Sequence, residues 1–232
     1  MPKPKIATHQ PNKKNLENSF FKKIFSWLDS NILFLFSTLL LIFIPLYPKI
    51  PLFDILPGYI VRVRFEDALI ALAGLTWIIQ LWRGKVVWKS PLFRLIGIYT
   101  LVGFLSILSA IFIIHTVPLE LLHVGKSALH LFRYMEYFFL FVLMYASLKT
   151  FKQAKIIVWM LVLTVLAVSF YGVGQKYWYW PVYSTMNREF SKGVRLYLTE
   201  HARVQSTFGG HYDLGAYLVI VLPILLALFY KS

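Results

Sequence analysis

Residues 91–114 read PLFRLIGIYTLVGFLSILSAIFII, an apolar run whose single charge is Arg94 near its start. A helix of this length crosses the hydrocarbon core of a bilayer, which is about 30 Å thick. Hydrophobic residues make up 58% of the 232-residue chain and charged residues only 15%, more apolar surface than a soluble domain of this size buries. The run therefore predicts a membrane-spanning helix in a protein that lies in a lipid bilayer.

Other apolar runs of comparable length flank this one. Together they predict an all-α fold, a polytopic transmembrane helix bundle of about six spans: Asn31–Tyr47, Glu66–Trp82, Pro91–Ile114, Ala128–Leu148, Ala154–Lys176 and Asp213–Tyr230. Residues 1–30 form a separate basic tail. Residues 31–232 form the membrane domain, whose largest hydrophilic loop is 177–212.

Lysine and arginine orient the bundle. If Met1 lies in the cytoplasm, the inner segments hold more Lys and Arg than the outer ones, as expected for membrane proteins. Both termini are therefore expected in the cytoplasm, with a partly disordered tail whose end, Phe20–Leu28, forms an interfacial helix. The net charge of +14 does not predict nucleic-acid binding, because the cations flank apolar helices, where anionic lipid headgroups account for them.

Metal and cofactor chemistry have little support. The chain has no cysteine, and its six histidines do not occur in a recognisable ligand spacing. Nucleotide-binding glycine motifs and the nucleophile motif of serine hydrolases are also absent from the sequence. We therefore predict no metal site and no cofactor.

Charges at the spans are the first candidates for function. Arg133 and Glu136 are one helical turn apart and predict an intramembrane pair, which either holds helices together or contributes to binding. Arg62 and Arg64 precede the second span, and they meet either an anionic ligand or lipid phosphates. The acids Glu66 and Asp67 follow them, at a helix start where negative charge is favourable.

The loop 177–212 is the second candidate. It opens on the aromatic segment Tyr177–Trp180, typical of a membrane interface, and continues with cations that include Arg195 and Arg203. A guanidinium forms forked hydrogen bonds to phosphate oxygens and stays charged. The segment then continues as Ser206-Thr-Phe-Gly-Gly-His-Tyr-Asp213, where two glycines either form a turn or let the backbone approach a ligand. We predict an anion-binding site formed by Arg203, Arg195, Ser206, Thr207 and His211.

The segment Arg203-Val-Gln-Ser-Thr-Phe-Gly-Gly-His-Tyr-Asp-Leu-Gly-Ala-Tyr217, with Leu222-Pro-Ile-Leu-Leu226 in the next span, resembles the motif of the O-antigen ligase and O-antigen polymerase family. Arg64-Phe-Glu-Asp67 and Phe132-Arg-Tyr-Met-Glu136 are similar to segments of the same family. The resemblance implies a multi-pass glycosyltransferase of the bacterial inner membrane, in lipopolysaccharide or polysaccharide biosynthesis. Such an enzyme moves a glycan from a polyprenyl-diphosphate carrier to a glycan, lipid or protein acceptor on the outer face, and Arg203 would hold the diphosphate.

In that family the catalytic histidine and a further arginine lie in a second large outer loop. No such loop precedes Ser232, so the resemblance implies that this chain is an N-terminal half, without catalytic residues of its own and inactive alone. Ligase, polymerase and protein-glycosylating activities stay open. The alternative is a non-enzymatic polytopic membrane protein such as a transporter component, although the broken helices and inverted repeats typical of transporters are not evident.

Overall fold

The computed structural model describes residues 13–53, 62–86, 90–185 and 189–231. Its main elements are six long helices: α1 Lys13–Leu46, α2 Phe65–Trp82, α3 Pro91–Phe112, α4 Leu121–Ser147, α5 Phe151–Tyr177 and α6 His211–Lys231. All six contain a segment long and apolar enough to cross a membrane. The predicted all-α polytopic bundle is therefore confirmed.

The chain divides into two compact units, residues 1–32 and 33–232. In the first unit, the described part of the predicted tail is helical from Lys13 onward, and Phe20–Leu28 belongs to the continuous helix α1. The predicted disorder at the start of the tail lies outside the described residues. The site described below belongs entirely to the second unit.

Local sequence accounts for the helix limits in the second unit. Ser90 Oγ accepts a hydrogen bond from Leu92 N at 3.3 Å, and Pro91 occupies the first turn of α3, where its missing N–H costs nothing. Thr150 and Gln153 form a reciprocal capping box at the start of α5. Helix α4 begins at Leu121, earlier than the predicted Ala128, because helical geometry continues past the end of the apolar run.

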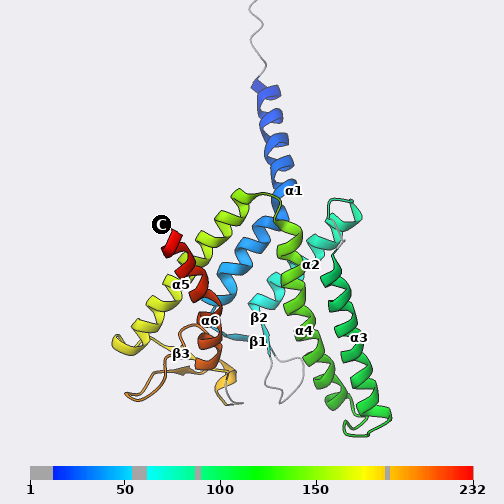
Figure 1. The fold of residues 1–232 in the computed structure, drawn as a ribbon, viewed down its shortest axis with the longest axis vertical. Coiled ribbons are helices and arrows are strands. Elements are labelled where there is room, and N and C mark those ends of the chain that lie inside the picture. The colour runs from blue at the N-terminus through cyan, green and yellow to red at the C-terminus, as the bar shows by residue number, and fades with distance from the viewer. Residues whose placement is uncertain (1–12, 54–61, 87–89, 186–188, 232) are drawn as a thin grey trace, which may run out of the picture. The chain divides into compact units, whose positions relative to one another are not determined.

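Helix α4 packs against both α2 and α3, and α5 packs against α6 (Figure 1). The α2–α4 contact includes an edge-to-face pair of Trp77 and Phe139 with ring centroids 6.0 Å apart. Leu143 of α4 and Val168 of α5 are buried, whereas most large apolar side chains of α3 are exposed. An apolar outer surface of this kind is expected of helices surrounded by lipid.

Two short antiparallel strand pairs lie at one end of the helices (Figure 1). β1 Pro51–Phe53 pairs with β2 Val63–Arg64, and β3 Val182–Tyr183 pairs with β4 Arg195–Leu196. A short 3₁₀ helix, η1 Phe190–Lys192, precedes Gly193, whose φ of 76° suits glycine and whose missing side chain allows close contact with Pro51. The α1–α2, α3–α4 and α5–α6 connections, all predicted to lie outside, thus share one end of the bundle.

Replacing Gly174 with alanine is expected to destabilise the fold by about 1–3 kcal/mol through overpacking. A Cβ at this position would lie 2.2–2.7 Å from three ring atoms of Trp180, and the Gly174 carbonyl accepts hydrogen bonds from Trp178 N and Trp180 N. The matched control is Gly215→Ala in α6, where a Cβ meets no atom within 4 Å. In thermal unfolding in detergent micelles, the midpoint temperature should fall for Gly174→Ala and not for Gly215→Ala. Equal midpoints for the two variants would contradict this packing.

Candidate functional site

The end of α1 and the start of α2 are joined by a buried ion pair. Lys49 Nζ lies 2.5 Å from Glu66 Oε2, and the two side chains are 8% and 7% exposed. Arg64 Nη1 donates to the other carboxylate oxygen of Glu66 at 3.1 Å. Lys49 also donates to the carbonyl of Ile44 at 2.7 Å, which satisfies one of the C-terminal carbonyls of α1. Burial lowers the pKa of the Lys49 ammonium, and the carboxylate of Glu66 opposes that shift.

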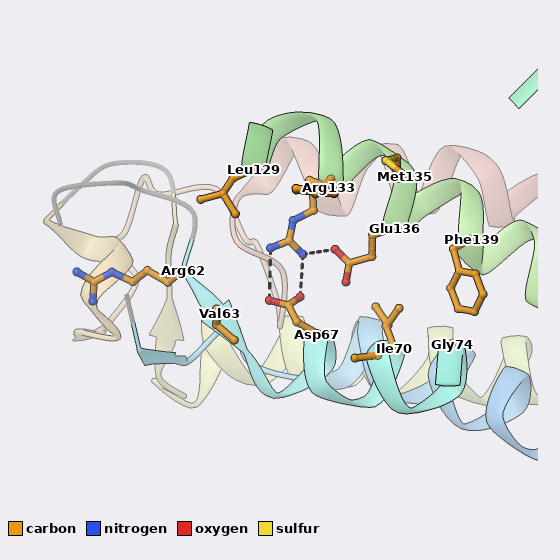
Figure 2. A pocket seen from close by; sticks show the side chains of 12 residues that line it. Arg62, Val63, Asp67, Ile70, Gly74, Leu129, Arg133, Met135, Glu136 and Phe139 are labelled. Carbon is orange, nitrogen blue, oxygen red and sulfur yellow. Dashed lines mark hydrogen bonds and ion pairs between the residues drawn. The ribbon is translucent and has the colours of Figure 1, made fainter. Parts of the chain in front are cut away.

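A second group of charges joins α2 to the middle of α4 (Figure 2). Arg133 Nη1 lies 2.8 Å from Asp67 Oδ1 and 2.8 Å from Glu136 Oε2, and Arg133 Nη2 lies 3.4 Å from Asp67 Oδ2. The predicted Arg133–Glu136 pair is thus present, with Asp67 as a further partner. Asp67 also accepts a hydrogen bond from Arg64 N at 3.0 Å, at the start of α2.

The two groups form one charge network of three cations and three carboxylates, composed of Lys49, Arg64, Glu66, Asp67, Arg133 and Glu136. Opposite charges balance within it, as groups removed from water require. Because Arg64 hydrogen-bonds Glu66, the structure gives it a protein partner in place of the lipid phosphate or anionic ligand considered from sequence. The network fixes the start of α2 against both α1 and α4.

A cavity of about 520 Å³, here called the chamber, lies beside this network. Its size falls in the range of small-molecule sites, roughly 300–1,000 Å³. The lining comes from the end of α1, the α1–α2 connection, α2, α4, the loop before α6 and the first turns of α6: Ile44, Lys49, Arg64, Glu66, Ile70, His130, Arg133, Tyr134, Glu136, Tyr137, Leu140, Thr185, Phe208, Gly209, Asp213 and Ala216. The chamber therefore joins the charge network to the segment singled out in loop 177–212.

Ser206 anchors that segment to α5. Its N–H donates to Gln175 Oε1 and its carbonyl accepts from Gln175 Nε2, both at 2.8 Å, while its hydroxyl donates to Val168 O at 2.7 Å. Ser206 has a φ of 54°, a left-handed conformation that is unfavourable for a residue with a side chain. Three hydrogen bonds hold it there, and the side chain is buried.

The neighbours of Ser206 are anchored in the same way. Thr207 donates its hydroxyl to Pro45 O, another C-terminal carbonyl of α1. Gln205 Nε2 donates to Tyr183 O at 3.0 Å and to Phe208 O at 3.3 Å. The predicted ligand contacts by Ser206 and Thr207 do not fit this geometry, because both hydroxyls already donate to backbone carbonyls in buried positions. Their hydroxyls hold the loop against α5 and α1.

Gly209 allows two parts of the loop, around Thr185 and Gly209, to approach each other closely. Its carbonyl accepts hydrogen bonds from Thr185 N at 2.8 Å and from Ser184 Oγ at 3.2 Å. A Cβ on Gly209 would lie 2.1 Å from Thr185 Oγ1, so a side chain here would displace Thr185. These contacts lie within the loop and fit the turn, one of the two interpretations left open by the sequence, whereas approach of the backbone to a ligand stays a prediction.

The predicted cations of the loop lie on its exposed side. Arg203 Nη1 is 3.4 Å from His211 Nε2, so the two residues are brought together at the start of α6. His211 lies between Gly209 and Asp213, which both line the chamber. Arg195 lies in β4 and donates from Nε to the Tyr183 hydroxyl at 3.3 Å, a contact that raises the pKa of its guanidinium. Arg62 lines a different cavity, between α2 and α4.

Two important residues escaped sequence reasoning. In the sequence, Gln175 is a single polar residue near the end of an apolar span, and Lys49 is a single cation beside the membrane, so neither indicates a specific partner. Both are buried and bonded. A usable signal was the polarity of Gln175 at a position where lipid would leave its amide unsatisfied. Lys49 and Glu66 become partners because the end of α1 meets the start of α2, where the rings of Phe43 and Phe65 are 5.7 Å apart, and because β1 pairs with β2.

Chemically, the arrangement suits binding of an anionic or hydroxyl-rich head group. The amides of the first turn of α6 and the Arg203 guanidinium favour negative charge, and the chamber carboxylates accept hydrogen bonds from hydroxyls. Among the described residues, no three His, Asp or Glu side chains are placed to hold a metal ion. Comparison with known proteins finds no family model, no curated protein and no solved structure that matches this chain.

Proposed function

We propose that this chain binds a polyprenyl-diphosphate-linked glycan and serves transfer of the glycan to an acceptor at the outer face of a bacterial inner membrane. The observation that carries the proposal is the Arg203–His211 contact at the start of α6, because Gly209 and Asp213, on either side of His211 in the sequence, line a chamber with charged groups. The resemblance of the Arg203–Tyr217 segment to O-antigen ligases and polymerases supports the same substrate class.

Each part of such a substrate has a matching partner. A diphosphate is doubly acidic and takes forked hydrogen bonds from a guanidinium, and it is favoured at a helix N-terminus. A sugar offers hydroxyl donors to carboxylates such as Glu136 and Asp213, and Tyr134 adds an aromatic surface. We assign Arg203 to the diphosphate and the chamber to the sugar next to it, and Ser206 keeps the loop in place.

Replacing Arg203 with alanine is expected to weaken binding of undecaprenyl diphosphate by about 10- to 100-fold, since a hydrogen bond to a charged group contributes roughly 1.5–3 kcal/mol. The 232-residue chain is placed in phospholipid nanodiscs and titrated with the labelled lipid. Arg203→Lys keeps the positive charge but cannot form the forked pair of hydrogen bonds, so its affinity should lie between those of the wild type and Arg203→Ala.

The matched control is Lys192→Ala, which removes one positive charge from the same loop at a side chain that is 49% exposed and paired with Glu189. It should change the affinity by less than about twofold, because exposed charges are screened by water and salt. Equal affinities for the wild type and Arg203→Ala would contradict the assignment. Equal losses of affinity in Arg203→Ala and Lys192→Ala would mean that the basic loop attracts the diphosphate through its overall charge and that Arg203 has no specific role.

A further inference from the structure

Helix α4 carries most of its polar side chains on one face. At 3.6 residues per turn they fall within an arc of about 100°, and most of the residues between them are apolar. A helix in contact with only lipid and apolar neighbours would not need such a face. The polar face, as it is called here, consists of His123, Lys126, Ser127, His130, Tyr134 and Tyr137.

Part of the polar face lines the chamber. His130, Tyr134 and Tyr137 all belong to the chamber lining. His130 is exposed, and Tyr134 and Tyr137 are 49% and 57% exposed. Because the same three residues form chamber wall and protein surface, the chamber is open on the side of α4.

Helix lengths give the depth of this opening. The contact of Arg133 with Asp67 sets the level of α4 against α2. From that level, α2 continues for about 22 Å to Trp82 and α4 for about 21 Å to Ser147, at 1.5 Å per residue. With these ends at one boundary of a hydrocarbon core about 30 Å thick, upright helices place the contact about 8 Å below the other boundary, and tilted helices place it deeper.

The rest of the polar face continues from this depth toward the end of the bundle that carries the two strand pairs, here called the strand end. Helix α4 begins about 18 Å before Arg133, and α3 runs beside it (Figure 1). Lys126 lies about 10 Å beyond Arg133, near the boundary of the core, with Ser127 and His130 between them. Lipid at this depth offers polar side chains no hydrogen-bond partners, whereas water does. Water along the polar face would satisfy them and connect the chamber to the solution.

The charge along this route is positive. Asp67 and Glu136 balance Arg133, which leaves Lys126 as the cation of the outer turns. No Asp or Glu occurs in α4 before Arg133. A passage lined by one sign of charge and walls of low polarity concentrates small ions of the opposite sign. The polar face therefore favours anions.

We propose that the polar face of α4 is one wall of a water-filled entrance, which leads from the strand end of the bundle to the chamber and favours small anions. Water-soluble anions reach the chamber from solution and not through the lipid. The inference does not depend on the function proposed above, because it concerns access to the chamber and not the molecule that the chamber holds.

The test places single cysteines in a chain that has none. Each variant is reconstituted into phospholipid nanodiscs and treated with sulfonatoethyl methanethiosulfonate, an anionic reagent that does not enter lipid. Thiolate is the reacting species, and it forms in water but not in hydrocarbon. Ser127→Cys and Tyr134→Cys, on the polar face, should react at least tenfold faster than Leu101→Cys.

Leu101 of α3 is the matched position in contact with lipid. In α3, Tyr99 packs on Tyr134 with ring centroids 6.4 Å apart, and Gly103 lies against Leu131. Leu101 is about half a turn from both, so it points away from α4 at the level of Tyr134. Its side chain is 56% exposed, against 49% for Tyr134, so the two positions differ mainly in what surrounds them.

Lys126→Gln tests the preference for anions. In Tyr134→Cys, the ratio of the rates with the sulfonate reagent and with its trimethylammonium counterpart should exceed the ratio for a free thiol in solution by at least about threefold. Adding Lys126→Gln should lower this ratio. Adding Lys192→Gln, which removes an exposed cation paired with Glu189, should leave it unchanged.

Equal rates for the polar-face cysteines and Leu101→Cys would overturn the entrance. So would slow reaction together with a disulfide between two chains under mild oxidation, because a second copy would then cover the polar face. A ratio that Lys126→Gln leaves unchanged would overturn the anion preference. Ser127→Cys replaces one atom, so it reports on the entrance even where loss of the Tyr134 ring disturbs packing. The affinity of Arg203→Ala for the diphosphate judges the proposed function separately.

Discussion

Replacing Glu66 with alanine is expected to lower the free energy of unfolding by about 3–5 kcal/mol, the cost of leaving a buried charge without its partner. Lys49 and Glu66 are 2.5 Å apart and almost fully buried, and Arg64 shares the same carboxylate. Without Glu66, the Lys49 ammonium would remain buried without its carboxylate partner. The measurement is equilibrium unfolding by denaturant in mixed micelles, followed by the loss of helical circular dichroism.

Two controls test the cause of that loss. Glu189→Ala breaks an exposed pair with Lys192 and should cost less than about 1 kcal/mol. In a Lys49→Met background, Glu66→Ala should cost at least about 1 kcal/mol less than in the wild type, because the buried ammonium is no longer present. Additive effects in that double-mutant cycle would show that the ion pair is not the source of the loss.

Replacing Gln175 with leucine is expected to cost about 3 kcal/mol and to loosen the loop that carries Arg203. The leucine side chain makes no hydrogen bond, so the N–H and the carbonyl of Ser206 would both lose their partner in a buried position, at roughly 1–3 kcal/mol each. Ser206 would then be free to leave its left-handed conformation. Unfolding measurements give the energy, and amide hydrogen exchange of residues 203–209 reports the loop.

Gln153 provides the matched glutamine. It also accepts backbone hydrogen bonds, from Lys149 N and Thr150 N, but at an exposed capping position. Gln153→Leu should therefore cost only about 0.5–1 kcal/mol and leave exchange in residues 203–209 unchanged. Similar costs for the two glutamines, or unchanged exchange in Gln175→Leu, would contradict the anchoring role of Gln175.

The two predictions concern different parts of one structure. Glu66 holds the connection after α1 against the start of α2, whereas Gln175 keeps the Arg203 loop against α5. The chamber lies where these parts meet, since Glu66 and Gly209 both line it. Loss of either anchor should therefore affect the shape of the chamber as well as the stability of the fold.

Much of the candidate site could be listed from sequence, but not its arrangement. Arg133 and Glu136 are one turn apart on a helix, so their pairing is a local property that helical geometry predicts. The partner of Arg133 on α2, Asp67, is 66 residues away, and Asp67 reads from sequence only as a favourable charge at a helix start. Ser206 and Thr207 read as ligand contacts, yet their hydroxyls bond Val168 O and Pro45 O.

The sequence by itself determined the six spans and the loops that share one end of the bundle. It placed the limits of the spans to within about two turns, except at the first span, which was predicted from Asn31 although α1 begins at Lys13 and its membrane-spanning segment at Phe21. Hydrophobicity and length are properties of a continuous segment, and lipid requires each such segment to satisfy its backbone hydrogen bonds internally as a helix. Only the tertiary structure decided which charges neutralise one another, why Ser206 keeps a φ of 54°, and where the chamber and the cavity between α2 and α4 lie. Those features arise from contacts between helices that are distant in sequence, and their energies depend on the burial that packing creates.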